Sequence, residues 1–292
     1  MENLMNNDAF MTIVESLAYI TAAFSIMFIG KIVYNITHRD IDVKKELVIN
    51  DNLAFSVAHV GYFIGLLMAV GSAIVGPSKG LLIDLMDIAI YGVLAIVLLN
   101  LSVFLNDKLI LRKFSVRKEI IEDRNVGTGV VEGASAIASG LIIFGAVAGE
   151  ADNLVHGITS AVAFWAIGQL ILVLTSYVYN LITPYDIHEH IEKDNVAVGI
   201  GFAGAMIAIA NLIRFAIEGE FEGWIEILSE VGIDVFIGLA LLPIIRLITD
   251  KILLPGAKLT DEIINQERPN IGASLVEAFA YIGGSVLLTW SL

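Results

Sequence analysis

The stretch KEIIEDRN (118–125), followed directly by VGTGVVEGASAIASG (126–140), shows how this chain is built. A charged segment ends at an asparagine, and a long apolar segment begins at the next residue. The same transition occurs at ELVINDN (46–52), EHIEKDN (189–195) and DEIINQERPN (261–270). The marker asparagines lie 73, 70 and 75 residues apart, at Asn52, Asn125, Asn195 and Asn270. Such a period indicates that one structural unit was copied along the chain.

The composition is that of a membrane protein. Hydrophobic residues make up 57% of the chain and charged residues 16%, with a mean hydropathy of +0.81. Soluble domains carry about 25% charged residues. The chain has no cysteine, which excludes disulfides, thiolate metal sites and cysteine nucleophiles. Its net charge of −14 argues against a nucleic-acid partner, which requires a basic face.

Apolar segments long enough to span a bilayer recur along the whole chain. A spanning helix needs about 20 mainly apolar residues. Eight segments qualify, near 12–36, 53–76, 81–105, 126–149, 154–182, 196–217, 225–249 and 271–291. The leader MENLMNNDAF is acidic and precedes no small-residue cleavage site, so the first segment is not expected to be a signal peptide. We predict an all-α, polytopic transmembrane bundle of eight helices in the lipid bilayer.

Basic residues predict the orientation of this bundle. Of 17 Lys and Arg residues, 13 lie in the long connections that hold the asparagines, and Lys79 alone lies in a short connection. The positive-inside rule then places the long connections in the cytoplasm and both termini outside.

The repeat has two levels. Markers one and three share D-N-[LV]-A, whereas markers two and four share N-[VI]-G-x-x-[VL]-V-E. VYN at 33–35 recurs at 178–180, and DKLIL at 107–111 recurs as DKILL at 250–254. The chain therefore divides into two four-helix membrane repeats, 1–150 and 151–292. An even helix number makes the halves parallel, and we expect a pseudo-twofold axis along the membrane normal to relate them.

The half resembles a known family. The tail IINQERPNIGASLVEAFAYIGGSVLLTW (263–290) and the segment INDNLAFSVAHVG (49–61) are similar to the domain of unknown function 350 family. These are small, YjfL-like bacterial four-helix membrane proteins, and this chain looks like a tandem duplication of one. The inserted Glu-Arg-Pro at 267–269 departs from the pattern. The resemblance implies a bacterial inner-membrane location and an association with envelope stress, and it supplies no activity.

Two glutamates are the sharpest candidates for chemistry. Glu132 and Glu277 each lie seven residues after a marker asparagine, about 10 Å along the helix. Small residues share their helix face, so both carboxyl groups are expected to point into the bundle. Asp87 and Glu230 occupy equivalent places in the third and seventh segments. We interpret these four as candidate proton- or cation-handling residues; the alternative is that each glutamate only fixes helix packing.

The asparagines allow two interpretations. An asparagine at a helix start accepts hydrogen bonds from free backbone N–H groups, so the simpler one is helix capping. The alternative is an anion-attracting patch at four clustered helix N-termini, suited to phosphate or a lipid headgroup. Elsewhere, Arg214 and Glu218 are spaced to pair, and Arg246 is expected to extend to the membrane surface.

Function stays open between two classes. A transporter or channel-like bundle would use the intramembrane acids as a polar path. A scaffold or envelope-stress regulator would recruit a cytoplasmic partner or anionic lipid at the basic loops, such as Arg112, Lys113, Arg117 and Lys118. Glycine-rich faces are compatible with a homo-oligomer. No enzyme motif such as H-E-x-x-H is present, and His188 and His190 lack a third ligand, so we expect neither enzyme activity, metal nor cofactor.

Overall fold

The structure, a computed structural model, describes residues 2–75, 78–148, 153–218, 223–254 and 256–291. This part of the chain is helical and contains no strand. Eight of its helices are long and apolar enough to cross a membrane, which confirms the predicted all-α bundle. They are α1 (Glu2–Thr37), α2 (Leu53–Gly71), α3 (Leu81–Leu109), α5 (Val126–Ala148), α6 (Leu154–Ile182), α8 (Val196–Ile217), α9 (Trp224–Ile248) and α11 (Ile271–Ser291).

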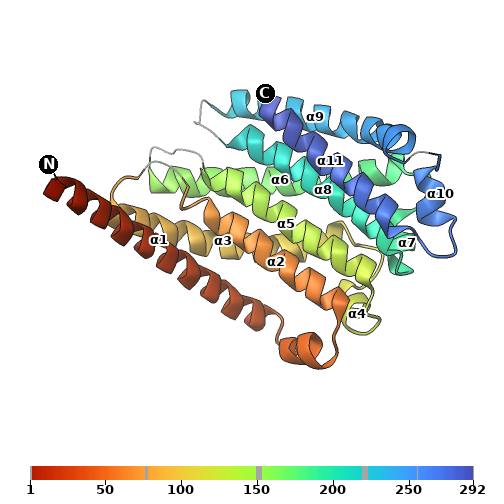
Figure 1. Cartoon of the computed structure of the whole chain (residues 1–292), viewed down its shortest axis with the longest axis horizontal. Coiled ribbons are helices and arrows are strands. Elements are labelled where there is room, and N and C mark those ends of the chain that lie inside the picture. The colour runs from red at the N-terminus through yellow and green to blue at the C-terminus, as the bar shows by residue number, and fades with distance from the viewer. Residues whose placement is uncertain (1, 76–77, 149–152, 219–222, 255, 292) are drawn as a thin grey trace.

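Short helical segments lie in the four long connections. They are the π-helical turn η1 (Lys45–Ile49), α4 (Val116–Ile121), α7 (Ile187–Glu192), the π-helical turn η2 (Thr249–Leu253) and α10 (Leu259–Ile264). All four connections lie at the same end of the bundle, where α4, α7 and α10 are seen in Figure 1. We call this the asparagine end, because it holds the four marker asparagines.

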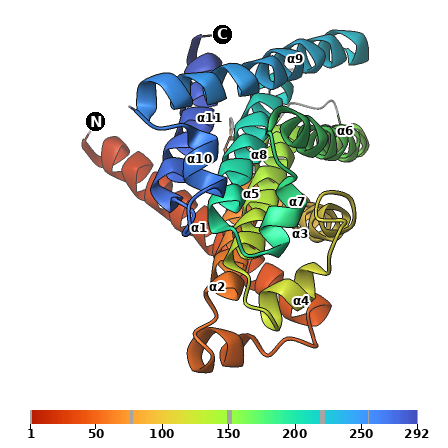
Figure 2. The same cartoon turned by 90° about the vertical axis from the view of Figure 1, so that its right-hand side faces the viewer.

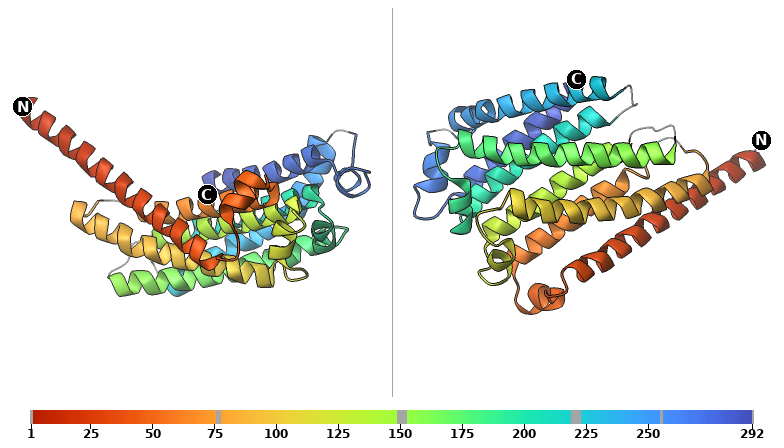
Figure 3. Two further views of the ribbon diagram at one scale, coloured as in Figure 1. Left: turned by 90° about the horizontal axis from the view of Figure 1, so that it is seen from below. Right: turned by 180° about the vertical axis from the view of Figure 1, so that it is seen from behind.

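The helices that follow the asparagines form the centre of the bundle. α2, α5, α8 and α11 stand side by side in chain order, each packed along the next (Figures 1 and 2). α3 and α6 pack against this row, and α9 packs against α8 and α11. α1 crosses the first half at an angle, and its N-terminal end extends away from the other helices (Figure 3). The row therefore holds most of the buried core, and its two middle helices, α5 and α8, are the most buried of the eight spans.

Small residues allow the row helices to approach closely. A Cβ atom added to Gly65 of α2 would lie 2.2 Å from the backbone oxygen of Ala136 on α5. A Cβ atom added to Gly204 of α8 would lie 2.5 Å from the Cα of Ala278 on α11. Contacts this short leave no room for a side chain. Packing at this distance supplies the van der Waals attraction that holds helices together in lipid, where the hydrophobic effect is absent.

The two halves do not face each other across a twofold axis as expected. They meet mainly through α5 and α8, which are not equivalent helices. A twofold axis that placed α5 against α8 would also place α11 against α2, yet these two helices lie at opposite ends of the row (Figure 1). The halves are parallel, and they follow one another along the row. Each half can therefore form a separate site.

A left-handed residue precedes three of the asparagines. Asp51, Arg124 and Asp194 have φ angles of 47°, 54° and 56°. This conformation reverses the chain at the end of a short helix, and it is uncommon for a residue other than glycine. The fourth asparagine follows Pro269, whose ring prevents a positive φ. The insertion before Asn270 lengthens this turn. The backbone N–H of Asn270 therefore donates to the backbone oxygen of Glu262, eight residues earlier in the chain.

Candidate functional site

Each marker asparagine caps the helix that follows it. The side-chain oxygens accept hydrogen bonds from the backbone N–H three residues ahead, at 2.8–3.1 Å. The donors are Phe55, Thr128, Val198 and Ala273. An N-cap of this kind satisfies one of the free N–H groups in the first helical turn.

The amide nitrogens of the same side chains connect neighbouring repeats. Asn52 donates to the oxygen of Ile120 at 2.9 Å, and Asn125 donates to that of Ile191 at 2.7 Å. Asn195 donates to the oxygen of Ile263 at 3.0 Å. Each asparagine thus ties its own helix to the short helix of the next repeat. Asn270, at the end of the row, instead donates to the carboxylate of Glu262.

Carboxylates lie beside three of these caps. Glu46, Glu119 and Glu262 accept hydrogen bonds from the asparagine amides at 2.7–2.9 Å. Glu46 and Glu119 are themselves buried. A carboxylate at the helix start repels a second anion, so this arrangement favours capping over an anion patch.

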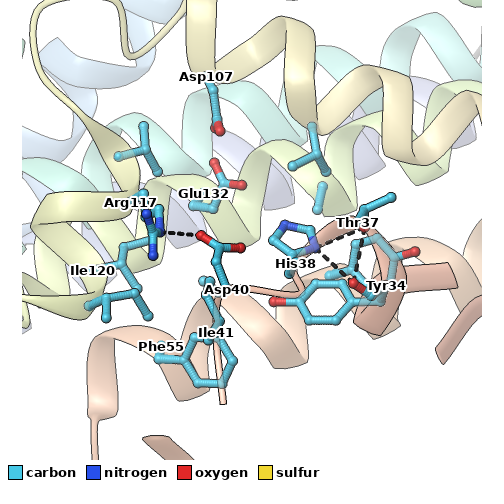
Figure 4. A pocket seen from close by; sticks show the side chains of 16 residues that line it. Tyr34, Thr37, His38, Asp40, Ile41, Phe55, Asp107, Arg117, Ile120 and Glu132 are labelled. Atoms are coloured by element: carbon cyan, nitrogen blue, oxygen red, sulfur yellow. Dashed lines mark hydrogen bonds and ion pairs between the residues drawn. The ribbon is translucent and has the colours of Figure 1, made fainter. Parts of the chain in front are cut away.

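In the first half, a pocket surrounds Glu132. The cavity measures about 260 Å³ and lies between the asparagine-end portions of α1, α2, α3, α4 and α5. Glu132 of α5 and Asp107 of α3 both line it, with their carboxyl groups pointing toward each other (Figure 4). The oxygens Glu132 Oε2 and Asp107 Oδ1 are buried, and apart from each other they have no hydrogen-bond partner in the described part of the chain. Two facing carboxyl groups repel each other unless a proton or a cation is shared between them.

An ion pair stands at the same pocket. Arg117 Nε lies 2.6 Å from Asp40 Oδ2, and both side chains are about half exposed. Beside them, His38 Nδ1 lies 3.0 Å from the backbone oxygen of Tyr34 (Figure 4). The formal charges of Asp40 and Arg117 cancel, so this ion pair supplies no net counter-charge to Glu132 and Asp107.

In the second half, the equivalent glutamate is neutralised. Glu277 is fully buried, and Oε1 lies 2.5 Å from Nη1 of Arg246 on α9. The hydroxyl of Tyr281 donates to the same oxygen at 3.1 Å, and that of Tyr179 at 3.4 Å. Arg246 has a 10% exposed side chain, so the expectation that it extends to the membrane surface is wrong. The buried carboxylate of Glu277 holds the Arg246 guanidinium inside the bundle and away from the membrane surface.

Two substitutions between the repeats explain this difference. Alignment of DKLIL with DKILL pairs Val103 with Arg246, and alignment of the glutamates pairs Ala136 with Tyr281. Val103 and Ala136 both line the first-half cavity. Their larger counterparts contact Glu277 directly. The same framework therefore encloses an acidic pocket in one half and an ion-paired glutamate in the other.

The counterpart of Asp107 also differs. Asp250 accepts a hydrogen bond from the backbone N–H of Leu259 at 2.5 Å, and it serves the turn before α10. Sequence reasoning used DKLIL only as a landmark and missed Asp107 as a site residue. The available signal was an acidic residue, Asp107, at the start of this motif and in the same half as Glu132.

The other two predicted acids lie far from both glutamates. Asp87 is twenty residues before Asp107 on α3, or about 30 Å along the helix. Its carboxylate lies 3.9 Å from Lys79 Nζ at the end opposite the asparagines. Glu230 is exposed on α9. The structure therefore brings neither residue to the Glu132 pocket or to the Glu277 ion pair.

The basic residues of the second long connection contact acidic or aromatic side chains. Lys113 pairs with Asp186, Lys118 with Asp123, and Arg112 lies over the ring of Tyr177. Hydrogen bonds from Lys113 and two backbone N–H groups outweigh partial burial and lower the pKa of Asp186. The predicted pair of Arg214 and Glu218 is present.

Eight apolar spans, a fourfold asparagine junction and two unequal acidic sites define a multi-pass membrane protein with a tandem internal repeat. The sequence pattern described as Domain of Unknown Function (DUF350) matches residues 7–147 and again 153–292. The chain therefore belongs to this family and contains two copies of its domain.

Similar proteins carry equally general names. A "UPF0719 transmembrane protein" of Aquifex aeolicus (strain VF5) is 22% identical over 92% of this chain and 97% of its own length. The "UPF0719 transmembrane protein YshE" of Bacillus subtilis (strain 168) is 32% identical over 36% of this chain and 75% of its own. A "UPF0719 transmembrane protein" of Mycolicibacterium paratuberculosis (strain ATCC BAA-968 / K-10) is 30% identical over 32% of this chain and 62% of its own length. No solved structure matches. Two of these relatives match about a third of this chain, as expected if one repeat can form a whole protein.

Proposed function

We propose that this chain is a non-enzymatic, cation-handling transporter or channel-like protein of the bacterial inner membrane. Its working site would be the pocket between Glu132 and Asp107. The observation that carries the proposal is the contrast between the halves. Glu277 has an internal cation in Arg246, whereas no Lys or Arg of the described chain forms an ion pair with Glu132 or Asp107.

The chemistry follows from two facing carboxyl groups. Their mutual repulsion is relieved when a proton or a positive ion enters, and it returns when the ion leaves. Such a pair can therefore bind and release a cation without a large structural change. By the positive-inside rule, the asparagine end is cytoplasmic and both termini are outside, so the pocket would exchange with the cytoplasm.

The second half would then act as a fixed support. Its glutamate is tied to Arg246 and two tyrosines, and a buried ion pair of this kind is costly to separate. In this proposal Glu277 has a structural role, and Asp87 and Glu230 belong to the opposite membrane surface. Glu132 is the one originally predicted acid that remains in the working site, with Asp107 as its partner.

The alternative function is a membrane scaffold or envelope-stress regulator that binds a cytoplasmic partner or anionic lipid through its basic loops. It has less support, because Lys113, Arg117 and Lys118 already pair with acidic side chains. Assembly into a homo-oligomer is compatible with either function and remains a prediction.

Flux through proteoliposomes tests the proposal. Purified full-length protein is reconstituted, and proton or monovalent-cation movement is followed with fluorescent indicators. We expect flux with the unmodified chain, and its loss in Glu132→Gln and in Asp107→Asn. Glu230→Gln, which changes an exposed acid, is the matched control and should retain flux. Absence of flux in the unmodified protein, or normal flux in the Glu132→Gln/Asp107→Asn double variant, would contradict the proposal.

A further inference from the structure

The first-half pocket combines carboxyl groups with aromatic rings. Tyr34 of α1, together with Phe55 and Tyr62 of α2, lines the cavity that Glu132 and Asp107 share. The three aromatic side chains are at least nine-tenths buried. The ring centroids of Tyr34 and Tyr62 are 4.7 Å apart. The Tyr62 hydroxyl accepts a hydrogen bond from Asn100 at 2.9 Å, which fixes one wall of the pocket.

Oxygen atoms in this lining would also suit a proton or a metal ion, and the aromatic rings are the feature that neither of these ions requires. A proton needs no cavity, and alkali and alkaline-earth ions are best bound by oxygen ligands. Aromatic faces instead attract cations with an organic, weakly hydrated head, including ammonium and guanidinium groups. The cavity of about 260 Å³ lies just below the usual size range of small-molecule pockets. The wall chemistry and the volume both point to a small organic ion.

The second half already holds an organic cation at the equivalent place. The guanidinium of Arg246 contacts Glu277, and its carbon lies 5.6 Å from the ring centroid of Tyr185. This framework thus accommodates a planar organic cation between a carboxylate and tyrosine rings. In the first half, Val103 occupies the sequence position equivalent to Arg246, and its shorter side chain lines the cavity.

We propose that the Glu132 pocket binds a small organic cation with an ammonium or guanidinium head, in the position that Arg246 fills in the second half. This inference rests on the proposed function for the location of the site and adds the chemical class of its ligand. The head group contacts Glu132 and Asp107 and lies against the rings of Tyr34, Phe55 and Tyr62.

The charges of the pocket suit a monovalent ligand. Asp40 and Arg117 form an ion pair and cancel formally. If Glu132 and Asp107 share one proton, and histidine is counted neutral, one negative charge remains. A monocation neutralises that charge and donates hydrogen bonds to the carboxyl oxygens that do not hold the shared proton.

Binding to the full chain in detergent tests the inference independently of transport. Ethylammonium and methylguanidinium are titrated by calorimetry and by their effect on Tm, with Na⁺ and K⁺ as inorganic comparisons. We expect saturable binding of the organic ions, and at least about tenfold weaker binding in Glu132→Gln, as for loss of a charge-assisted contact.

A variant that places its own cationic side chain in the pocket provides the sharpest control. Val103→Arg introduces an internal guanidinium at the position of Arg246, and it should abolish binding while the protein remains folded. Val103→Met adds bulk without charge and should weaken binding less. Equal Tm shifts with Na⁺ or K⁺, unchanged binding in Val103→Arg, or no binding of either organic probe would overturn the inference. Proton flux without probe binding would refute this inference alone, whereas probe binding without any flux would refute the proposed transport.

Discussion

Arg246 Nη1 lies 2.5 Å from Glu277 Oε1 inside the second half, whereas Glu132 at the same repeat position faces the carboxyl group of Asp107. One inherited acid thus has two different environments in one chain. The cause lies in the residues one helical turn away, where Val103 and Ala136 replace an arginine and a tyrosine. After duplication, a few substitutions are sufficient to give one glutamate a facing carboxyl group and its copy an arginine partner.

The ion pair predicts a strong and asymmetric mutational effect. Arg246→Gln leaves Glu277 buried without its counterion, and should lower the free energy of unfolding in detergent by about 3–5 kcal/mol. The double variant Arg246→Gln/Glu277→Gln should recover much of that loss, because no unpaired charge remains. Arg214→Gln breaks a more exposed pair and should cost less than about 1 kcal/mol. Equal losses for Arg246→Gln and Arg214→Gln would contradict this account.

The asparagine junctions predict a dependence on position in the row. Asn125→Ala removes a cap, the bond to Ile191 and the partner of the buried Glu119, so we expect a loss of about 2–4 kcal/mol. Asn270→Ala removes an exposed cap at the end of the row and should cost about 1 kcal/mol. Chemical denaturation of both variants in one detergent compares their free energies of unfolding. A larger loss for Asn270→Ala than for Asn125→Ala would contradict a stabilising role for the asparagine bonds between repeats.

Close helix contacts predict opposite effects for two glycine substitutions. Gly65→Ala forces a methyl group against the backbone of Ala136 and should destabilise the protein by about 1–3 kcal/mol. Gly232→Ala on α9 meets no atom within 4 Å, so it should be neutral or stabilise the helix by up to about 1 kcal/mol. The Tm of each variant in detergent is the measurement. A similar fall in both would contradict this account, because the Gly232→Ala variant meets no neighbour and gains helix propensity.

His188 predicts a pH dependence at the asparagine end. Burial lowers the pKa of His188, despite the nearby Ile110 oxygen at 2.7 Å and the Asp186 carboxylate, which both raise it. The folded state therefore favours the neutral ring. The stability that His188 contributes is complete above its unfolded pKa of about 6.5, and it is lost as pH falls below that value toward the folded pKa.

Replacement of that ring should reduce the acid sensitivity. His188→Gln keeps a side-chain N–H donor but cannot be protonated in this range, so the fall in Tm between pH 7.5 and pH 5.5 should be smaller than in the unmodified chain. His190→Gln, on the same short helix, serves as the control and should leave the fall unchanged. Identical pH profiles for the His188→Gln variant and the unmodified chain would exclude His188 as the source.

Several features followed from the sequence alone, because they depend on local properties of the chain. Segments of about 20 apolar residues predict membrane helices whatever their neighbours are. An asparagine at the start of such a segment predicts a cap, since the free N–H groups belong to the same helix. The spacing of seven residues from Asn125 also singled out Glu132. The number of membrane-spanning helices, and the start of the four helices that follow the asparagines, required no knowledge of packing.

The tertiary structure decided which acid is open and which is neutralised. Asp107, Arg246 and Tyr281 act on the glutamates through contacts between helices, and such contacts depend on which faces meet. The repeat suggested two halves around an axis, but glycine contacts placed α5 against α8 and made a row in which each half forms its own site. A local pattern specifies a helix and its register. The charge balance of a buried carboxyl group depends on every side chain that packing brings within a few ångströms of it.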